Sequence, residues 1–249
     1  NALSFAVCKA LSEMIPDCMA NDTITALVLT GAGRMFMAGA DIREFNLQRP
    51  ADVPDFHEVL GAMEAAPKPI VAAINGVALG GGLELAMGCH YRLIAPGAQV
   101  GQPEIKLGFI PGAGGTQRLP RLAGIEAALD MIVGGEPISA ERAVELGIAD
   151  ELVAGDLLAR ALEYAAMRAA SGEAPAATGR RDAKITGIDA SAFADYRAKI
   201  AGRSRGLDAR FEAIKCLPAA AHPRYPLDLI SVPAPRHHGC RLPAGPPPP

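Results

Sequence analysis

The sequence lacks the features of several large protein classes. It has no apolar run of the roughly 18 to 20 residues that a membrane-spanning helix needs, and it does not open with a secretory signal pattern. Its formal net charge is -3, and no stripe of lysine and arginine appears between residues 1 and 170. We therefore expect no nucleic-acid partner and no membrane partner. These absences predict a soluble protein of the cytoplasm or an organelle matrix, with the cytoplasm as the first expectation.

The sequence also lacks paired cysteines and complete phosphate-binding motifs. No CxxC or Cys/His ligand spacing occurs among its five cysteines, which are Cys8, Cys18, Cys89, Cys216 and Cys240. This pattern indicates neither a disulfide framework nor a zinc site, so we expect reduced packing residues and no metal. The glycine runs miss the lysine and the serine or threonine of a P-loop, and also the complete GxGxxG of a dinucleotide site. We expect no NAD and no other cofactor.

Apolar periodicity predicts an α/β fold. The 249 residues are 50% hydrophobic, which supports a sizeable core. Short apolar runs at 26–30 and 69–74 are typical of buried strands, and a helix is predicted between them around 53–66. Two buried strands joined through a helix imply a right-handed parallel crossover. The remaining expected elements are helices at 3–21, 83–89, 125–133, 140–146 and 157–170, and extended segments at 91–95 and 149–153.

Composition divides the chain into three parts. Residues 1–170 are predicted to form the core, and the small residues from 171 onward are typical of a linker. Helical spacing returns at 193–216, so 171–217 is predicted to be a linker and a helical segment. Its basic side chains are either a solvated helix face or a contact to an anionic ligand, and they are Lys199, Arg203 and Arg205. Ten of the 21 prolines lie in 218–249, which predicts a disordered, proline-rich tail.

The most informative motif is a glycine-rich turn followed by two glutamates. Residues 80–82 are all glycine and precede Glu84, whereas Glu104 precedes a second glycine loop at 111–115. Glycine allows positive φ and close approach to a ligand, and the first N–H groups of a helix are unpaired donors. The turn is therefore a candidate oxyanion hole. Two glutamates beside it could divide general acid and general base work, which predicts chemistry on a carbonyl compound.

Each part of the motif also has a plain structural interpretation. Glu84 alone could be a helix-start carboxylate favoured by the helix dipole, and Glu104 alone could be a solvated loop acid. The loop from Gly112 to Gly115 could merely cap a helix, and Asp41 could be an N-cap. Their occurrence together, in this order, favours a catalytic role.

These segments together resemble the enoyl-CoA hydratase/isomerase (crotonase) family. The sequence Ala-Gly-Ala-Asp-Ile at 38–42, the segment 75–84 and the segment 102–117 are similar to the family's three active-site segments. The resemblance implies a crotonase-like ββα superhelical spiral core followed by a helical C-terminal region. Within the family, 76–90 and 119–150 look most like the N-terminal hydratase region of multifunctional fatty-acid β-oxidation proteins.

The resemblance also implies a role for individual residues. The N–H groups of Ala38 and Gly81 would hold the thioester oxygen, Glu84 would deprotonate a water molecule, and Glu104 would deliver a proton to the α-carbon. The backbone of Gly112 would help to hold that water. The residues implied in binding the CoA substrate are Ala2, Leu3, Ala38, Gly39, Ala40, Asp41 and Gly112.

The implied activity is that of an enoyl-CoA hydratase, which adds water syn to a trans-2-enoyl-CoA and gives a 3-hydroxyacyl-CoA in β-oxidation. The alternatives are a Δ3,Δ2-enoyl-CoA isomerase on the same fold and an inactive truncated fragment. The fragment is considered because the sequence begins inside the family's Asn-Ala-Leu segment, so the first strands would be missing, and because the proline-rich tail replaces an expected helix. The expected partner is an acyl-CoA substrate, with the chain a homotrimer, a hexamer or part of a longer multifunctional chain.

Overall fold

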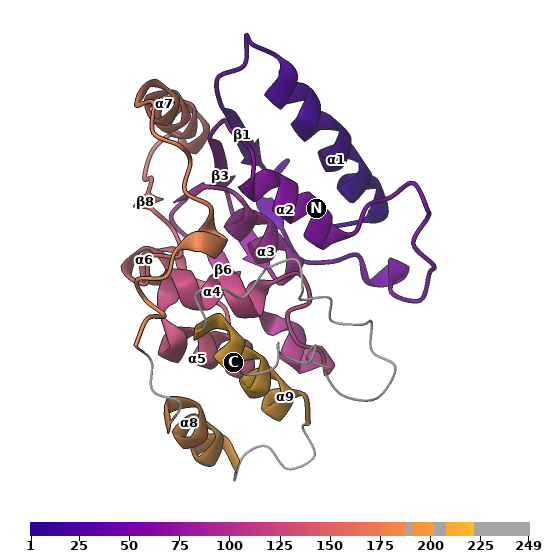
Figure 1. The fold of residues 1–249 in the computed structure, drawn as a ribbon, viewed down its shortest axis with the longest axis vertical. Coiled ribbons are helices and arrows are strands. Elements are labelled where there is room, and N and C mark those ends of the chain that lie inside the picture. Colours follow the sequence, from indigo (N-terminus) through magenta and orange to yellow (C-terminus); the bar gives the residue numbers. More distant parts are fainter. Residues whose placement is uncertain (188–190, 202–207, 222–249) are drawn as a thin grey trace, which may run out of the picture.

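Two four-stranded sheets run through the fold (Figure 1), and the first six strands of the chain alternate between them. The computed structural model describes residues 1–187, 191–201 and 208–221. The first sheet is parallel throughout, in the order β1 (Leu27–Thr30), β3 (Ile70–Ile74), β5 (Tyr91–Ile94) and β8 (Glu151–Leu152). The second has the order β2 (Met35–Met37), β4 (Val77–Leu79), β6 (Gln99–Gly101) and β7 (Ile138–Ser139). In that sheet β7 is antiparallel to its neighbour β6.

The helices follow pairs of strands, so the chain advances in ββα repeats. The repeats are β1, β2 and α2, then β3, β4 and α3, then β5, β6 and α4. The α-helices of the described residues are α1 (Phe5–Ala20), α2 (Phe56–Glu64), α3 (Gly81–Gly88), α4 (Gly115–Ala123), α5 (Ile125–Gly134), α6 (Ala140–Glu145), α7 (Leu157–Ala170), α8 (Ser191–Ala201) and α9 (Asp208–Cys216). The short 3-10 helices are η1 (Ile42–Glu44), η2 (Pro103–Leu107), η3 (Thr178–Arg180) and η4 (Leu217–Ala221). This arrangement confirms the predicted α/β class and the ββα spiral core.

Strand β3 is buried on both faces, which explains its continuous apolar sequence. Ile70, Ala72 and Ile74 point into the main core, whereas Val71 and Ala73 belong to a second cluster beneath α7. Successive side chains of a strand point to opposite faces, so a strand covered on both sides needs apolar residues at every position. The predicted parallel crossover is confirmed by the pairing of β1 with β3.

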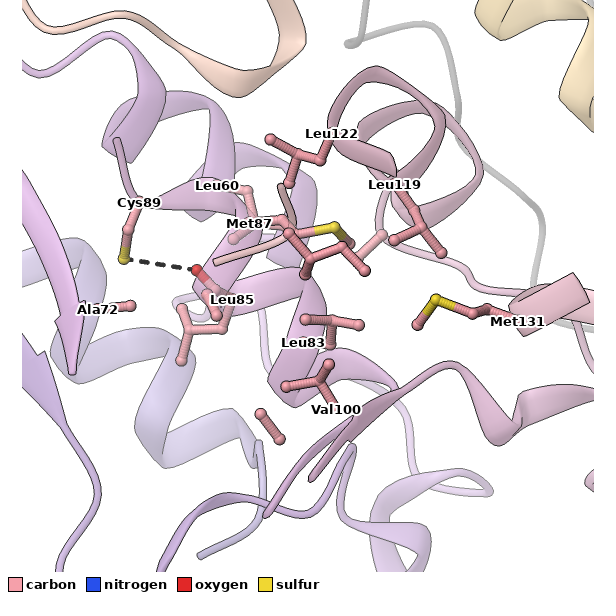
Figure 2. Packing of buried hydrophobic residues seen from close by; sticks show 14 of the residues in the cluster. Leu60, Ala72, Leu83, Leu85, Met87, Cys89, Val100, Leu119, Leu122 and Met131 are labelled. Carbon is pink, nitrogen blue, oxygen red and sulfur yellow. Dashed lines mark hydrogen bonds between the residues drawn. The ribbon is translucent and has the colours of Figure 1, made fainter. Parts of the chain in front are cut away.

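Helix α3 lies in the middle of the core, and all eight of its residues are buried. Leu83, Leu85 and Met87 pack among side chains of α2, α4 and α5, as Figure 2 shows. The thiol of Cys89, just after the helix, donates to the Leu85 carbonyl oxygen. A helix that is apolar on all sides is stable only when it is enclosed. The single acidic side chain in this helix is Glu84, which is therefore buried with it.

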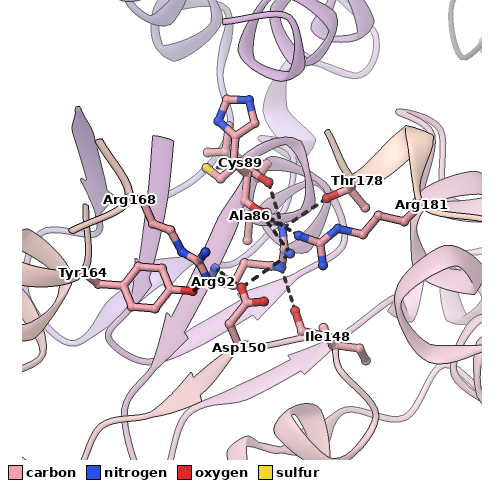
Figure 3. Close-up of polar contacts among 11 residues, drawn as sticks. Ala86, Cys89, Arg92, Ile148, Asp150, Tyr164, Arg168, Thr178 and Arg181 are labelled. Carbon is pink, nitrogen blue, oxygen red and sulfur yellow. Dashed lines mark hydrogen bonds and ion pairs between the residues drawn. The ribbon is translucent and has the colours of Figure 1, made fainter. Parts of the chain in front are cut away.

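Arg92 ties the C-terminal end of α3 to the following strands (Figure 3). Its fully buried guanidinium donates to the carbonyl oxygens of Cys89 at 2.8 Å and of Ile148 at 2.7 Å. It also donates to Thr178 Oγ1 at 3.2 Å, and the Asp150 carboxylate lies 3.6 Å from Nη2. A cation at the end of a helix complements the partial negative charge of its last carbonyl groups. This contact fixes one end of the helix that carries Glu84.

Several elements were not predicted from the sequence. Strands β2, β4 and β6 have three residues each, which is too short for an alternating pattern to be recognised. Helix α4 contains Pro120 and two arginines, yet residues 115–122 are all buried. The expected helices at 83–89, 125–133, 140–146 and 157–170 are confirmed as α3, α5, α6 and α7, with the last bounded as predicted.

The chain after α7 packs against the core where the structure describes it. Thr178 is fully buried in η3, and Leu217 and Ala220 of η4 are buried, with η4 packed against α4. The predicted helical stretch 193–216 contains α8 and α9, whereas Arg203 and Arg205 lie outside the described residues. Residues 222–249 of the predicted tail also lie outside them. The three-part division at 170 and 217, the disordered tail and the role of the basic group stay predictions.

The described cysteines behave as packing residues. Cys8, Cys18, Cys89 and Cys216 form no disulfide with one another, and Cys240 lies outside the described residues. Burial raises the pKa of the Cys8 thiol to about 11 and that of Cys89 to about 12. In the described part of the chain, none of the helices combines the length and the apolar composition that crossing a bilayer requires.

His90 provides a test of this packing. It is fully buried between α3 and β5, where Nδ1 accepts from the Ile70 N–H at 3.0 Å and Nε2 lies 3.3 Å from the Glu64 carbonyl oxygen. These partners require the neutral ring, and burial lowers the pKa of His90. Below about pH 6.5 the unfolded chain binds a proton that the folded chain does not, so stability is lost as the pH falls.

We expect the free energy of unfolding to fall faster with acidification in the wild type than in His90→Gln, by up to about 1.4 kcal/mol per pH unit. Urea unfolding of both proteins between about pH 7.5 and about pH 5 measures this difference. Equal pH dependence in the two proteins would contradict it.

Candidate active site

Gly80 makes the turn that starts α3. Its φ of 53° and ψ of -127° lie in a region open to glycine alone. Its N–H donates to the Gly101 carbonyl oxygen at 2.9 Å, which links β4 to β6 just before η2. A Cβ added at Gly80 would lie 2.8 Å from Oε1 of Glu104. The turn therefore brings the N-terminus of α3 against the Glu104 carboxyl group.

The first turn of α3 also lies against the segment 38–41. A Cβ at Gly81 would lie 3.6 Å from the Ala40 nitrogen, and one at Gly82 would lie 2.1 Å from the Met37 carbonyl oxygen. Gly81 is the first residue of the helix, so its N–H has no intrahelical acceptor. The structure thus brings together the two segments that were predicted to form an oxyanion hole.

The second predicted oxyanion donor is already engaged. The Ala38 N–H donates to the Asn1 carbonyl oxygen at 3.1 Å, so a substrate oxygen would have to replace that carbonyl. Next to it, the Leu3 N–H donates to the Gly39 carbonyl and the Asp41 N–H donates to the Leu3 carbonyl, each at 2.8 Å. Residues 1–3 therefore form one wall of the site beside 38–41.

The other residues predicted to bind CoA lie in different surroundings. Asp41 is the N-cap of η1, and its hydrogen bonds with Arg43 lower its pKa to about 2. This confirms the N-cap interpretation of Asp41. Ala2 is half-buried, Ala40 is exposed, and Gly112 is exposed with open space where a side chain would start. Their contacts with CoA stay predictions.

Glu84 is held by the glycine loop before α4. Its side chain is 3% exposed, and Oε1 accepts from the N–H groups of Ala113 and Gly115, both at 2.8 Å. Burial raises the pKa of Glu84, and the two hydrogen bonds and the charge of Arg118 oppose that rise. The loop was predicted to lie at the site, but the donors Ala113 and Gly115 carried no signal of their own in the sequence.

Glu104 lies on η2 and is half-buried, with its carboxyl group beside Gly80. Burial and the negative charge of Glu84 raise the pKa of Glu104 to about 8. The pKa of both groups is raised, so the two carboxyl groups share protons as a coupled pair. The two N–H groups that donate to Oε1 favour the ionised form of Glu84.

Gln102 contacts the same carboxyl group and was given no role from the sequence. It is fully buried, and its amide nitrogen, when turned toward Glu104, donates to Oε1 at 2.9 Å and to Oε2 at 3.1 Å. An amide can present either a donor or an acceptor by rotating its end. Gln102 can therefore match either the ionised or the protonated form of Glu104.

Metal ligands are absent from the described part of the chain: no group of three or more histidine, cysteine, aspartate or glutamate side chains is placed to hold an ion. The chemistry of the site consists of two carboxyl groups, one buried amide and the N–H groups at the start of α3.

Comparison with known proteins agrees with this geometry. The sequence profile described as enoyl-CoA hydratase/isomerase matches residues 1–183. The chain belongs to this family. The enoyl-CoA hydratase of Bacillus anthracis superposes with a TM-score of 0.65 at 32% sequence identity, covering 87% of each chain. The predicted family and fold are therefore confirmed.

Relatives in this enzyme family include both single-function and multifunctional proteins. The peroxisomal bifunctional enzyme of Danio rerio is 48% identical over 165 residues, which are 66% of this chain and 23% of that protein. The human peroxisomal bifunctional enzyme is 47% identical over the same share. A probable enoyl-CoA hydratase of Bacillus subtilis is 45% identical over 59% of both chains. The chain thus matches about a quarter of the length of the bifunctional relatives.

The coupling between the two glutamates can be measured directly. In Glu84→Gln we expect the pKa of Glu104 to fall from about 8 toward its ordinary value, because the negative charge beside it is gone while the burial remains. Carbon-13 NMR of protein labelled at the glutamate side-chain carboxyl carbons follows this titration. The control is Glu141→Gln, an exposed position on α6. A Glu104 titration that is the same in all three proteins would contradict the coupling.

Proposed function

We propose that this chain is an enoyl-CoA hydratase, which adds water syn to a trans-2-enoyl-CoA and gives a 3-hydroxyacyl-CoA. The observation that carries the proposal is the pair of carboxyl groups beside the start of α3, in which the buried Glu84 accepts from two N–H groups and the half-buried Glu104 faces the amide of Gln102. Hydration needs a proton removed from water and a proton given to carbon in one site, and this pair offers both.

The proposed steps balance without any further reactant. The oxygen of water bonds to the β-carbon while the ionised Glu84 takes one of its protons, and the protonated Glu104 gives its proton to the α-carbon. Negative charge passes through the thioester oxygen, which the N–H groups of Gly81 and Ala38 would stabilise. Transfer of the proton from Glu84 back to Glu104 restores the pair. The backbone of Gly112 is proposed to help hold the water.

The proposal requires no cofactor, because the chain itself supplies the acid, the base and the oxyanion donors. The CoA part of the substrate is proposed to contact the wall formed by residues 1–3 and 38–41, which includes Ala2, Leu3, Gly39, Ala40 and Asp41. Membership of an acyl-CoA-processing family supports this substrate class.

The assembly and the cellular location are proposed from the names of the relatives. Three plant relatives are named as peroxisomal or glyoxysomal fatty acid β-oxidation multifunctional proteins, which supports a place within a longer chain acting in that process. A homotrimer or hexamer is the alternative assembly. The same names make a peroxisome the location to test against the predicted cytoplasm.

Loss of the enoyl-thioester absorbance of crotonyl-CoA tests the activity. We expect Glu84→Gln and Glu104→Gln each to lower kcat by about 10² to 10⁴, because each removes one proton-transfer step. Glu141→Gln on the exposed face of α6 serves as the matched control and should keep wild-type turnover. Full activity in either active-site variant, or double-bond migration without hydration, would refute the hydratase and in the second case favour an isomerase.

The oxyanion donor is tested through Gly81. A Cβ there would lie 3.1 Å from Leu3 Cδ2 and would narrow the gap to the segment 38–41. We expect Gly81→Ala to lower kcat by about 10² to 10³ with a smaller change in KM, because the N–H is displaced from the developing charge. The control is Gly61→Ala in α2, where an added Cβ meets open space. Equal kcat in the two variants would remove Gly81 from the mechanism.

A further inference from the structure

A buried ion pair lies beside the glycine loop that binds Glu84. Arg118 of α4 and Glu64 at the end of α2 are 2.8 Å apart, and their side chains are 3% and 7% exposed. Removing two such charges from water is costly, and the attraction between them repays that cost only when their other polar atoms are also satisfied. The partners of this pair therefore indicate what it holds in place.

Both members of the pair bind backbone of other segments. Arg118 Nη1 donates to the Ala113 carbonyl oxygen at 2.8 Å, and Glu64 Oε1 accepts from the Gly179 N–H at 2.8 Å. Nη1 also lies close to Gly114, because a Cβ there would be 2.4 Å from that nitrogen. Gly114 has a φ of 88°, which glycine adopts without strain. Arg118 is thus hydrogen-bonded to the loop at 113–115 and packed against it.

The same loop also binds Glu84 through hydrogen bonds. The peptide groups of Ala113 and Gly115 donate to Glu84 Oε1, so Ala113 binds Arg118 through its carbonyl and Glu84 through its N–H. Three helices are joined in this way, α2 by Glu64, α4 by Arg118 and α3 by Glu84. In the described residues, no hydrogen bond engages Oε2 of Glu84, which leaves that oxygen for the reaction.

We propose that the Glu64–Arg118 ion pair is a positioning device for Glu84, in which Arg118 fixes the 113–115 loop so that Oε1 is held and Oε2 is presented to the reacting water. This inference rests on the proposed hydratase function for its meaning, but the geometry can be tested without activity. Arg118 and Glu64 are positioning residues, since they act on the reaction through the loop.

Several charged groups face Glu84 from the elements packed around α3. They are His57 on α2, Glu104 on η2 and Arg118 on α4, and Glu64 of α2 lies beyond Arg118 as its ion-pair partner. Of these, the charge of Arg118 and that of His57 lower the pKa of Glu84. Loss of Arg118 therefore removes both a favourable charge and the anchor of the loop.

The experiment compares the titration of Glu84 in the wild type, Arg118→Met and Arg118→Lys by carbon-13 NMR. The variant Glu84→Gln assigns the signal. We expect Arg118→Met to raise the midpoint by about one pH unit or more, since an opposite charge at close range lowers a carboxyl pKa by about one to three units. Arg118→Lys keeps the charge but loses the forked contact, so its midpoint should stay near that of the wild type while kcat falls.

Arg121→Met is the matched control, because Arg121 is equally buried on the same helix but its Nη1 donates to the Gln117 carbonyl instead of the loop. It should leave the Glu84 midpoint in place. If Arg118→Met does not fold, Glu64→Gln answers the question, because it removes the partner that fixes Arg118 but keeps the charge of Arg118, so the 113–115 loop is released and kcat should fall.

No shift in Arg118→Met, equal shifts in Arg118→Met and Arg121→Met, or wild-type kcat in Glu64→Gln would overturn the positioning role. If the Arg118 variants shift the Glu84 midpoint as expected but the wild type does not hydrate crotonyl-CoA, the proposed function is refuted and the positioning role stands.

Discussion

The start of α3 packs backbone against backbone, and the rest of the site depends on this close approach. A Cβ at Gly82 would lie 2.1 Å from the Met37 carbonyl oxygen, and one at Gly80 would meet the Glu104 carboxyl group. Only a run of glycines lets a helix begin so near a strand end and the segment that carries Glu104. Any side chain there would push α3 outward and separate Gly81 from the segment 38–41. The position of Glu84, one turn further along the same helix, follows from this packing.

The second consequence is electrostatic. Because α3 is wholly enclosed, Glu84 at its first turn and Arg92 beyond its last turn are both buried, and each complements the helix dipole at its own end. Figure 3 shows the end at Arg92. The carboxylate is further stabilised by two N–H donors, and the guanidinium by several carbonyl oxygens. Burial that would be costly for either charge alone is thus offset by dipoles that the fold already provides.

The catalytic candidates were readable from the sequence because they lie inside short, contiguous motifs. Glu84 follows the last glycine of the run by two positions. The apolar run of β3 and the apolar periodicity of α7 identified those two elements. The ion pair that supports the site could not be predicted from the sequence. Glu64 and Arg118 are 54 positions apart and meet only after α2, α3 and α4 have packed together. A sequence with two arginines and a proline looks like a surface segment, and nothing local indicates that α4 is buried.

The two carboxyl groups differ in how rigidly their surroundings hold them. Glu84 Oε1 is bound by two peptide N–H groups, which always donate and so always favour the ionised form. Glu104 faces the amide of Gln102, which can donate to a carboxylate or accept from a protonated carboxyl group after rotating. A base that must be charged at the start of each turnover gains from fixed donors. An acid that must lose and regain its proton gains from a partner that can follow either state, and this asymmetry assigns the base role to Glu84 and the acid role to Glu104 in the proposed hydration.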